Sequence, residues 1–214
     1  MAIFALDDSF VFPPVHLAEP DGLLAIGGDL SPERLLAAYR AGIFPWYENP
    51  PILWWCPNPR FVLFPEELKL SKSLKPLLNR NAFSFTINKD FKQVIDQCKT
   101  VPRAGQQSTW ITDEIKAAYL NLHETGYAHS AEVWQDGRLA GGLYGIKIGK
   151  VFFGESMFSR VSNASRYALA KYITSQKDEI RLIDCQIFTY YLASMGARMI
   201  DGGDFNTYLK QYCL

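Results

Sequence analysis

Two polar side chains, Asp184 and Gln186, interrupt an otherwise apolar stretch near the C-terminus. The segment 182–188 reads Leu-Ile-Asp-Cys-Gln-Ile-Phe and predicts a short buried strand. Because side chains alternate along a strand, the polar pair is expected on one face, with Cys185 and the isoleucines on the other. A carboxylate and an amide on an inner strand are unfavourable unless they are hydrogen-bonded or take part in a reaction. Their spacing alone leaves open whether they satisfy nearby loop backbone or serve catalysis.

A second apolar stretch, 151–158, carries a polar pair at Glu155 and Ser156. The pentad around Ser156 lacks the second glycine of the GxSxG nucleophile turn, and no acid–histidine pair is placed to activate its hydroxyl. The recurrence of a polar pair in an apolar strand favours catalysis, with Glu155, Asp184 and Gln186 as the candidate group.

Basic residues gather in one part of the chain. Between Lys69 and Arg103 there are eight basic and two acidic residues, although the formal net charge of the chain is zero. A local basic surface gathers phosphates even on a neutral protein, and such binding depends strongly on salt. The same charges also suit a solvated helical face. The candidates for contacts with a nucleic-acid backbone are Lys69, Lys72, Lys75 and Arg80.

Three of the five tryptophans, at positions 46, 54 and 55, lie among prolines that prevent regular helix. Buried packing accounts for some of them. A rigid aromatic side chain near a basic segment is also what stacking on an unpaired base requires.

Composition narrows the class of protein. The chain has 214 residues, 48% of them hydrophobic and 21% charged, as in ordinary globular proteins. No apolar run approaches the roughly 20 residues of a membrane span, and the N-terminus does not resemble a signal peptide. Four widely separated cysteines and three scattered histidines argue against a metal site or a disulfide framework. We therefore expect a cytoplasmic protein without a metal site. No amphipathic surface helix stands out, so a monomer is expected by default.

The elements that must position these residues fall into two parts. Residues 1–65 are punctuated by proline, glycine and tryptophan and predict a small N-terminal domain, with a helix beginning after Ser31. Residues 66–214 alternate between helices and strands. The expected helices are 71–79, 90–99, 112–124, 163–175, 191–195 and 204–211. The expected strands are 83–87, 128–134, 138–148, 151–157, 182–188 and 197–200.

This order predicts an α+β fold with a mixed, mostly antiparallel sheet flanked by helices, as in GNAT-type acyltransferases. A GNAT enzyme that uses acyl-CoA carries a glycine-rich loop after the third strand of the meander. Here the corresponding stretch, 158–165, contains no glycine. The acyl donor is therefore not expected to be a CoA thioester.

The chain resembles the leucyl/phenylalanyl-tRNA–protein transferase family. The resemblance rests on motifs spread from residue 22 to residue 186. These are GLLAIGGDL at 22–30, GIFPW at 42–46, WWCPNPR at 54–60, TWIT at 109–112, HSAEVW at 129–134, GESMFSR at 154–160 and IDCQ at 183–186. It implies a GNAT-like domain behind a small N-terminal domain, and it implies no metal or nucleotide cofactor. It also implies transfer of Leu or Phe from aminoacyl-tRNA to proteins with N-terminal Lys or Arg, which marks them for degradation through an N-degron.

The resemblance also implies roles for single residues. Trp46 and Trp110 would hold the 3′-terminal adenosine of the tRNA. The pocket for the Leu or Phe side chain would be lined by Leu143, Phe152, Met157 and Tyr172. The polar catalytic group would be Glu155, Asp184 and Gln186. The family often has phenylalanine at the position of Tyr172 and asparagine at that of Thr189.

The implied reaction is aminolysis of an ester, which needs positioning of the reactants more than proton abstraction. In this hypothesis Asp184 anchors Gln186, the amide carbonyl orients the incoming amine, and Glu155 or Asp184 supplies negative charge for a Lys or Arg N-terminus. Two alternatives stay open: a CoA-dependent N-acetyltransferase on the same fold, and a non-catalytic RNA-binding module. The choice among Leu, Phe and Met as the transferred residue also stays open.

Overall fold

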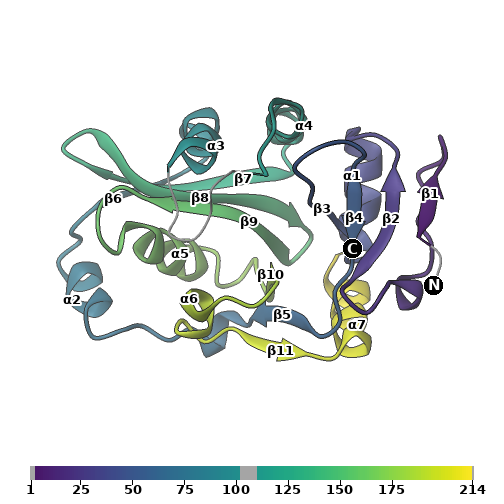
Figure 1. Cartoon of the computed structure of the whole chain (residues 1–214). Coiled ribbons are helices and arrows are strands. Elements are labelled where there is room, and N and C mark those ends of the chain that lie inside the picture. Colours follow the sequence, from purple (N-terminus) through teal and green to yellow (C-terminus); the bar gives the residue numbers. More distant parts are fainter. Residues whose placement is uncertain (1–2, 102–109, 214) are drawn as a thin grey trace.

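A computed structural model describes residues 3–101 and 110–213, and in these ranges the chain forms two β-sheets with helices around them (Figure 1). The smaller sheet lies at the N-terminal end of the molecule and has the strand order β1-β2-β4-β3. Its strands are β1 (Phe4–Leu6), β2 (Leu23–Gly27), β3 (Phe44–Pro45) and β4 (Leu53–Trp55), and it is accompanied by the 3-10 turn η1 (Val15–Leu17) and by α1 (Pro32–Arg40).

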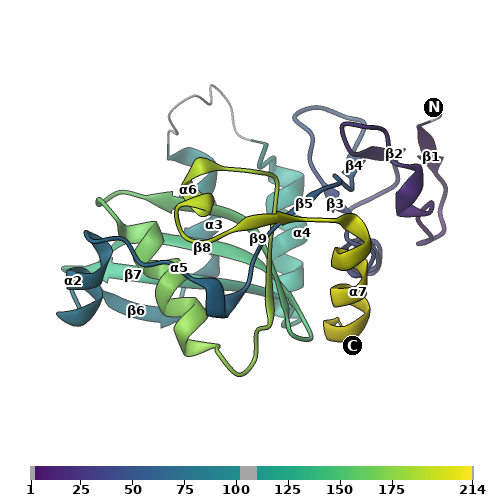
Figure 2. The ribbon, with the colours of Figure 1, turned by 90° about the horizontal axis from the view of Figure 1, so that it is seen from below.

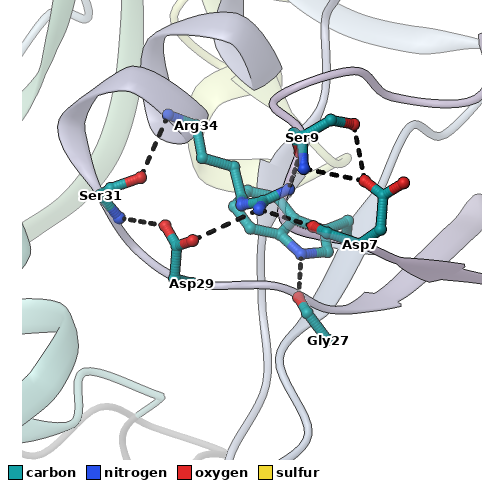
Figure 3. Close-up of polar contacts among 7 residues, drawn as sticks. Asp7, Ser9, Gly27, Asp29, Ser31 and Arg34 are labelled. Atoms are coloured by element: carbon teal, nitrogen blue, oxygen red, sulfur yellow. Dashed lines mark hydrogen bonds and ion pairs between the residues drawn. The ribbon is translucent and has the colours of Figure 1, made fainter.

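A buried arginine ties the N-terminal segment to the smaller sheet. Ser31 caps α1 by accepting a hydrogen bond from the backbone N–H of Arg34, as its position before Pro32 predicts. The guanidinium of Arg34 donates to the carbonyl oxygens of Ser9 (2.8 Å) and Asp7 (2.9 Å) and pairs with Asp29 (3.3 Å) (Figure 3). The chain before β2 is thereby fixed against α1.

The larger sheet has the strand order β11-β5-β10-β9-β8-β7-β6. Neighbouring strands are antiparallel except β9 and β10, which run parallel. This confirms the predicted mixed, mostly antiparallel sheet. The strands are β5 (Arg60–Leu63), β6 (Ser84–Ile87), β7 (Ala128–Gln135), β8 (Arg138–Ile148), β9 (Val151–Ser159), β10 (Leu182–Gln186) and β11 (Arg198–Ile200).

Helices cover both faces of the larger sheet. In Figure 1, α3 (Phe91–Thr100) and α4 (Asp113–Glu124) lie on one face and α5 (Ala164–Ser175) on the other. Each face has its own apolar core, because α3 and α4 contribute to one buried cluster and α5 to a second. The remaining helical elements are η2 (Pro65–Glu67), α2 (Leu74–Asn79), α6 (Tyr190–Ala193) and α7 (Gly202–Tyr212). No helix in the described ranges is long and apolar enough to cross a membrane.

One strand of the larger sheet comes from the part of the sequence that the prediction assigned to the N-terminal domain. β5 precedes the predicted division at 65/66, yet it lies between β10 and β11. The final strand therefore pairs with β5 and not with the strand at 182–186. Local periodicity marks a strand but carries no information about a partner more than a hundred residues away, so this insertion was not predicted.

The two parallel strands diverge beyond a short paired stretch. Residues 182–184 of β10 pair with residues 151–153 of β9, but β9 continues to Ser159 while β10 ends at Gln186. On its other side β10 shifts register against β5 between Asp184 and Gln186. The strict alternation expected for 182–188 is therefore broken by a bulge, and a gap opens in the sheet after residue 153.

Candidate active site

A cavity of about 520 Å³ lies where β9 and β10 diverge. Seven of the residues singled out from the sequence line it: Trp46, Trp110, Leu143, Phe152, Glu155, Met157 and Gln186. Asp184 and Tyr172 lie behind its wall, and the four basic candidates lie elsewhere. The divergence of two strands thus brings together side chains that are far apart in sequence.

Glu155 is the carboxylate of this cavity. It is buried, and it accepts hydrogen bonds from the hydroxyls of Tyr39 (2.8 Å) and Tyr119 (3.1 Å) and from the amide nitrogen of Gln186 (2.8 Å). Burial raises the pKa of Glu155 to about 7, against the opposing effect of these hydrogen bonds. The carboxylate is therefore held in place and poised between its two protonation states near neutral pH.

The two tyrosines that hold Glu155 were not found from the sequence. Tyr39 lies in α1 and Tyr119 in α4, and both are fully buried with their hydroxyls close to each other. Burial and the nearby Glu155 raise the pKa of both phenols well above the ordinary value, so both remain neutral donors. A tyrosine at an apolar position of a helix gives no local sign of such a partner.

Gln186 closes β10 in a left-handed backbone conformation, with φ of +64°. A residue other than glycine holds this conformation at a cost of about 1–3 kcal/mol unless its surroundings fix it. Here the backbone N–H of Gln186 donates to Asp184 (2.9 Å), and its amide nitrogen donates to Glu155. The amide carbonyl is the part of Gln186 that is left to accept a hydrogen bond from a ligand in the cavity.

Asp184 forms a buried ion pair. Its carboxylate is fully buried and receives two parallel hydrogen bonds from Arg60, at 2.8 Å and 2.6 Å. The guanidinium of Arg60 lies between the rings of Phe44 (4.9 Å) and Phe205 (4.8 Å). Asp184 is thus neutralised and anchors the backbone of Gln186, while Glu155 faces the cavity. This pair was not predicted from the sequence, although an arginine at the start of the apolar strand 60–63 is a signal that could have indicated it.

The apolar end of the cavity is lined by Leu143, Phe152 and Met157, together with Leu169 and Ile183. Tyr172 is fully buried behind Phe152, with the two ring centroids 4.7 Å apart. Its hydroxyl has no hydrogen-bond partner within the described residues.

Two partly exposed tryptophans, called here the tryptophan rim, also line the cavity. Trp46 is 40% exposed, and Trp110 is half-buried. The indole N–H of Trp55 donates to the backbone oxygen of Trp46 (2.7 Å), and the two rings lie 5.7 Å apart. Trp54, in contrast, is fully buried and donates to Gly27, so it belongs to the core. Trp46 is therefore presented by a braced backbone with much of its face open.

The basic candidates Lys69, Lys72, Lys75 and Arg80 are exposed, on and around α2. In Figure 1 this helix lies at the end of the molecule away from the smaller sheet. Arg103, the end of the basic segment, lies outside the described residues.

Comparison with known proteins gives the family. A family model described as "Leucyl/phenylalanyl-tRNA protein transferase" matches residues 62–210, and the model of the N-terminal domain of that family matches residues 28–58. A leucyl/phenylalanyl-tRNA–protein transferase of Syntrophus aciditrophicus is 54% identical over 99% of this chain and 89% of its own length. One of Flavobacterium johnsoniae is 52% identical over 97% of this chain and 99% of its own length.

Among solved structures, a GCN5-related N-acetyltransferase from Kribbella flavida superposes with a TM-score of 0.33 at 12% identity. It matches 78% of this chain, and the match spans 60% of its own length. The sequence relationships are far closer than this structural one. The chain therefore belongs to the leucyl/phenylalanyl-tRNA–protein transferase family, a family of aminoacyltransferases.

Proposed function

We propose that this protein transfers Leu or Phe from aminoacyl-tRNA to the α-amino group of proteins whose N-terminal residue is Lys or Arg, and so marks them for degradation. The observation that carries the proposal is the position of the Glu155–Gln186 pair. The pair lies in a cavity that is also lined by apolar side chains and by two tryptophans, so one cavity offers groups that could hold an acyl side chain, a reacting amine and an adenine base.

In this proposal the aminoacyl end of the tRNA enters the cavity with its amino-acid side chain toward the apolar residues and its adenosine toward the tryptophans. The Leu or Phe side chain enters the apolar end at Leu143, Phe152 and Met157, where burial of apolar surface favours it. The 3′-terminal adenosine stacks on Trp46 and Trp110. Stacking on an aromatic ring does not depend on hydrogen bonds to the edge of the base. Tyr172 supports the pocket from behind Phe152. The exposed lysines around α2, with Arg80, gather the phosphates of the tRNA.

The reaction is ester aminolysis. The amine nitrogen bonds to the ester carbonyl carbon, the bond from that carbon to the ribose oxygen breaks, and a peptide bond forms. The amine gives up a proton, and the leaving ribose oxygen takes one up, with the neighbouring ribose hydroxyl as a relay. Because the ester is already activated, the protein mainly aligns the two reactants, and such alignment supplies roughly 7–11 kcal/mol of the barrier.

The contacts around Gln186 give each side chain a task in this alignment. The amide carbonyl of Gln186 accepts a hydrogen bond from the incoming amine. Arg60 and Asp184 act as positioning residues, because they hold the strained backbone of Gln186 through the Asp184 carboxylate. Glu155, in its ionised form, supplies the negative charge that favours a cationic N-terminal residue, since the other carboxylate is neutralised by Arg60.

A transfer assay tests the proposal. Purified protein is mixed with tRNA charged with labelled Leu, Phe or Met and with a peptide that begins with Arg, and an otherwise identical peptide that begins with Ala is the control. We expect labelled product from Leu- and Phe-tRNA with the Arg peptide alone. Absence of product from all three donors, or acetylation of the peptide from acetyl-CoA in the same assay, would overturn the proposal.

A further inference from the structure

A patch of exposed apolar side chains begins at the residue after Gln186. Ile187, Phe188, Tyr190 and Met199, called here the outer patch, are between 42% and 86% exposed. Large apolar side chains are ordinarily left exposed singly, whereas a cluster of them marks a binding surface. The outer patch therefore needs a partner.

The outer patch is continuous with the wall of the cavity. Ile187 lines the cavity itself. The ring of Phe188 lies 5.3 Å from that of Phe61 and 5.0 Å from that of Tyr190. Met199 pairs with Phe61 across β11 and β5, which places it beside the same ring. One surface thus runs from the cavity across α6 to the edge strand β11.

The chemistry of aminolysis indicates which of the two substrates contacts the outer patch. In the tetrahedral intermediate of aminolysis the amine nitrogen and the ribose oxygen are separate substituents of the same carbon, so the acceptor and the adenosine cannot occupy the same part of the cavity. The tryptophan rim follows β3, and the outer patch starts at the rim next to α6. In both views β3 lies in the smaller sheet, and α6 lies away from that sheet, beside the larger one (Figures 1 and 2). An adenosine on the tryptophans leaves the α6 rim to the acceptor.

We infer that the outer patch binds the acceptor polypeptide at the two or three residues that follow its N-terminal residue, and that it favours large apolar side chains there. The inference rests on the proposed function. An extended chain advances roughly 3.3 Å per residue, so three residues span about 10 Å. Phe188 and Tyr190 follow Gln186 by two and four residues, so an acceptor of this length passes close to them. Recognition of the acceptor then extends beyond its N-terminal residue. The contact with the N-terminal residue is ionic, and the contacts with the residues that follow are apolar.

The test uses two acceptor peptides of equal length and charge, one beginning Arg-Phe-Leu and the other Arg-Ser-Ser. For the wild-type protein we expect kcat/KM to be about tenfold higher for the apolar peptide, as half-burial of one large side chain implies. In the double variant Phe188→Ser/Tyr190→Ser the ratio should fall to about one. Transfer to the Arg-Ser-Ser peptide and the KM for aminoacyl-tRNA should not change.

The matched control is Val11→Ser/Leu17→Ser, which removes exposed apolar side chains from the smaller-sheet part of the chain and should keep the tenfold ratio. Equal kcat/KM for both peptides in the wild type, or an unchanged ratio in the outer-patch variant, would overturn the inference. So would a raised KM for aminoacyl-tRNA in that variant, which would assign the surface to nucleic acid. A dimer of the wild type that the variant abolishes would assign it to a second copy. If the wild type transferred to neither peptide, the proposed function would fail, and this inference with it.

Discussion

At the scale of single residues, the protonation state of Glu155 is the quantity on which the site depends. Its pKa lies near 7 because the carboxyl is buried, although three hydrogen bonds favour its ionised form. In the proposed function the ionised form would attract a cationic acceptor, and the protonated form would not.

We therefore predict that kcat/KM for an Arg-initiated peptide rises with pH through an inflection near 7, and that this inflection is absent in Glu155→Gln. Ionisation of the peptide amine contributes to both profiles, so the difference between them isolates Glu155. Profiles of the same shape for both proteins would show that this carboxyl does not govern acceptor use.

The same shift makes a prediction about stability. Between pH 4.5 and about 7 the folded state keeps a proton on Glu155 that the unfolded state has released. Stability must then fall as pH rises through this window, on the order of 3 kcal/mol in total, and level off above it. Urea titrations from pH 4 to pH 8 should show this fall in the wild type and lack it in Glu155→Gln. Parallel curves would mean that the pKa of Glu155 is not raised.

Arg60 is predicted to act on turnover through Asp184. Arg60→Lys keeps the charge but cannot make two parallel hydrogen bonds to the carboxylate. Loosening of Gln186 should lower kcat about 10- to 100-fold, the effect of one lost hydrogen bond to a charged group, with little change in either KM. The matched control is Arg34→Lys, another buried arginine, which bonds the N-terminal segment away from the cavity. Both variants should unfold at a lower temperature, and Arg60→Lys alone should lose turnover.

At the scale of elements, we propose that the tryptophan rim binds the 3′-terminal adenosine of the tRNA and that the lysines around α2 bind its phosphates. Trp46→Ala and Trp110→Ala should each weaken binding of an aminoacyl-adenosine by roughly 1–3 kcal/mol, the contribution of stacking on one base. Trp134→Ala is the control, because Trp134 lies in β7 and does not line the cavity. The affinity for aminoacyl-adenosine is measured by calorimetry. If it were unchanged in both rim variants, the tryptophans would contribute to packing and not to binding of the adenosine.

For α2 the expected effect is on salt dependence. Replacement of Lys72 and Lys75 by Ala should reduce the slope of log K against log salt for tRNA binding by about 1.4–1.8, since each phosphate contact adds roughly 0.7–0.9. Lys177→Ala/Lys210→Ala removes the same charge from exposed sites elsewhere and should leave the slope unchanged. Equal slopes in all three proteins would remove α2 from the tRNA footprint.

Most helices and strands were predictable from local sequence signals, but the contacts between distant elements, such as the pairing of β5 with β10 and β11, were not. Ser31, Thr112 and the turn at 136–137 mark element boundaries by their own chemistry, and the structure has helices and a hairpin there. The insertion of β5, the bulge before Gln186 and the tyrosines behind Glu155 all depend on contacts between distant segments. Asp184 and Gln186 were found because polar residues in a buried strand are exceptional, whereas Tyr39 and Tyr119 sit where tyrosine is ordinary.

At the scale of the whole molecule, both parts of the chain build the site. The smaller sheet and α1 supply Phe44, Trp46 and Tyr39, while β9 and β10 supply Glu155 and Gln186. Arg60 links these parts, because it bonds Asp184 in β10 and lies between Phe44 of β3 and Phe205 of α7. The arrangement of the two sheets therefore fixes the distance between Trp46 and the Glu155–Gln186 pair, which in the proposed function is the distance between the adenosine and the amine.

The central claim is that Gln186 aligns an amine beside an ester that needs no further activation. It is tested most directly by single-turnover transfer of labelled Phe from Phe-tRNA to an Arg-initiated peptide, at saturating concentrations, by the wild type and by Gln186→Ala. We predict a rate about 100-fold lower in the variant, as for misplacement of a reactant, with affinity for Phe-adenosine within about twofold of the wild type. An unchanged rate in Gln186→Ala would contradict the claim.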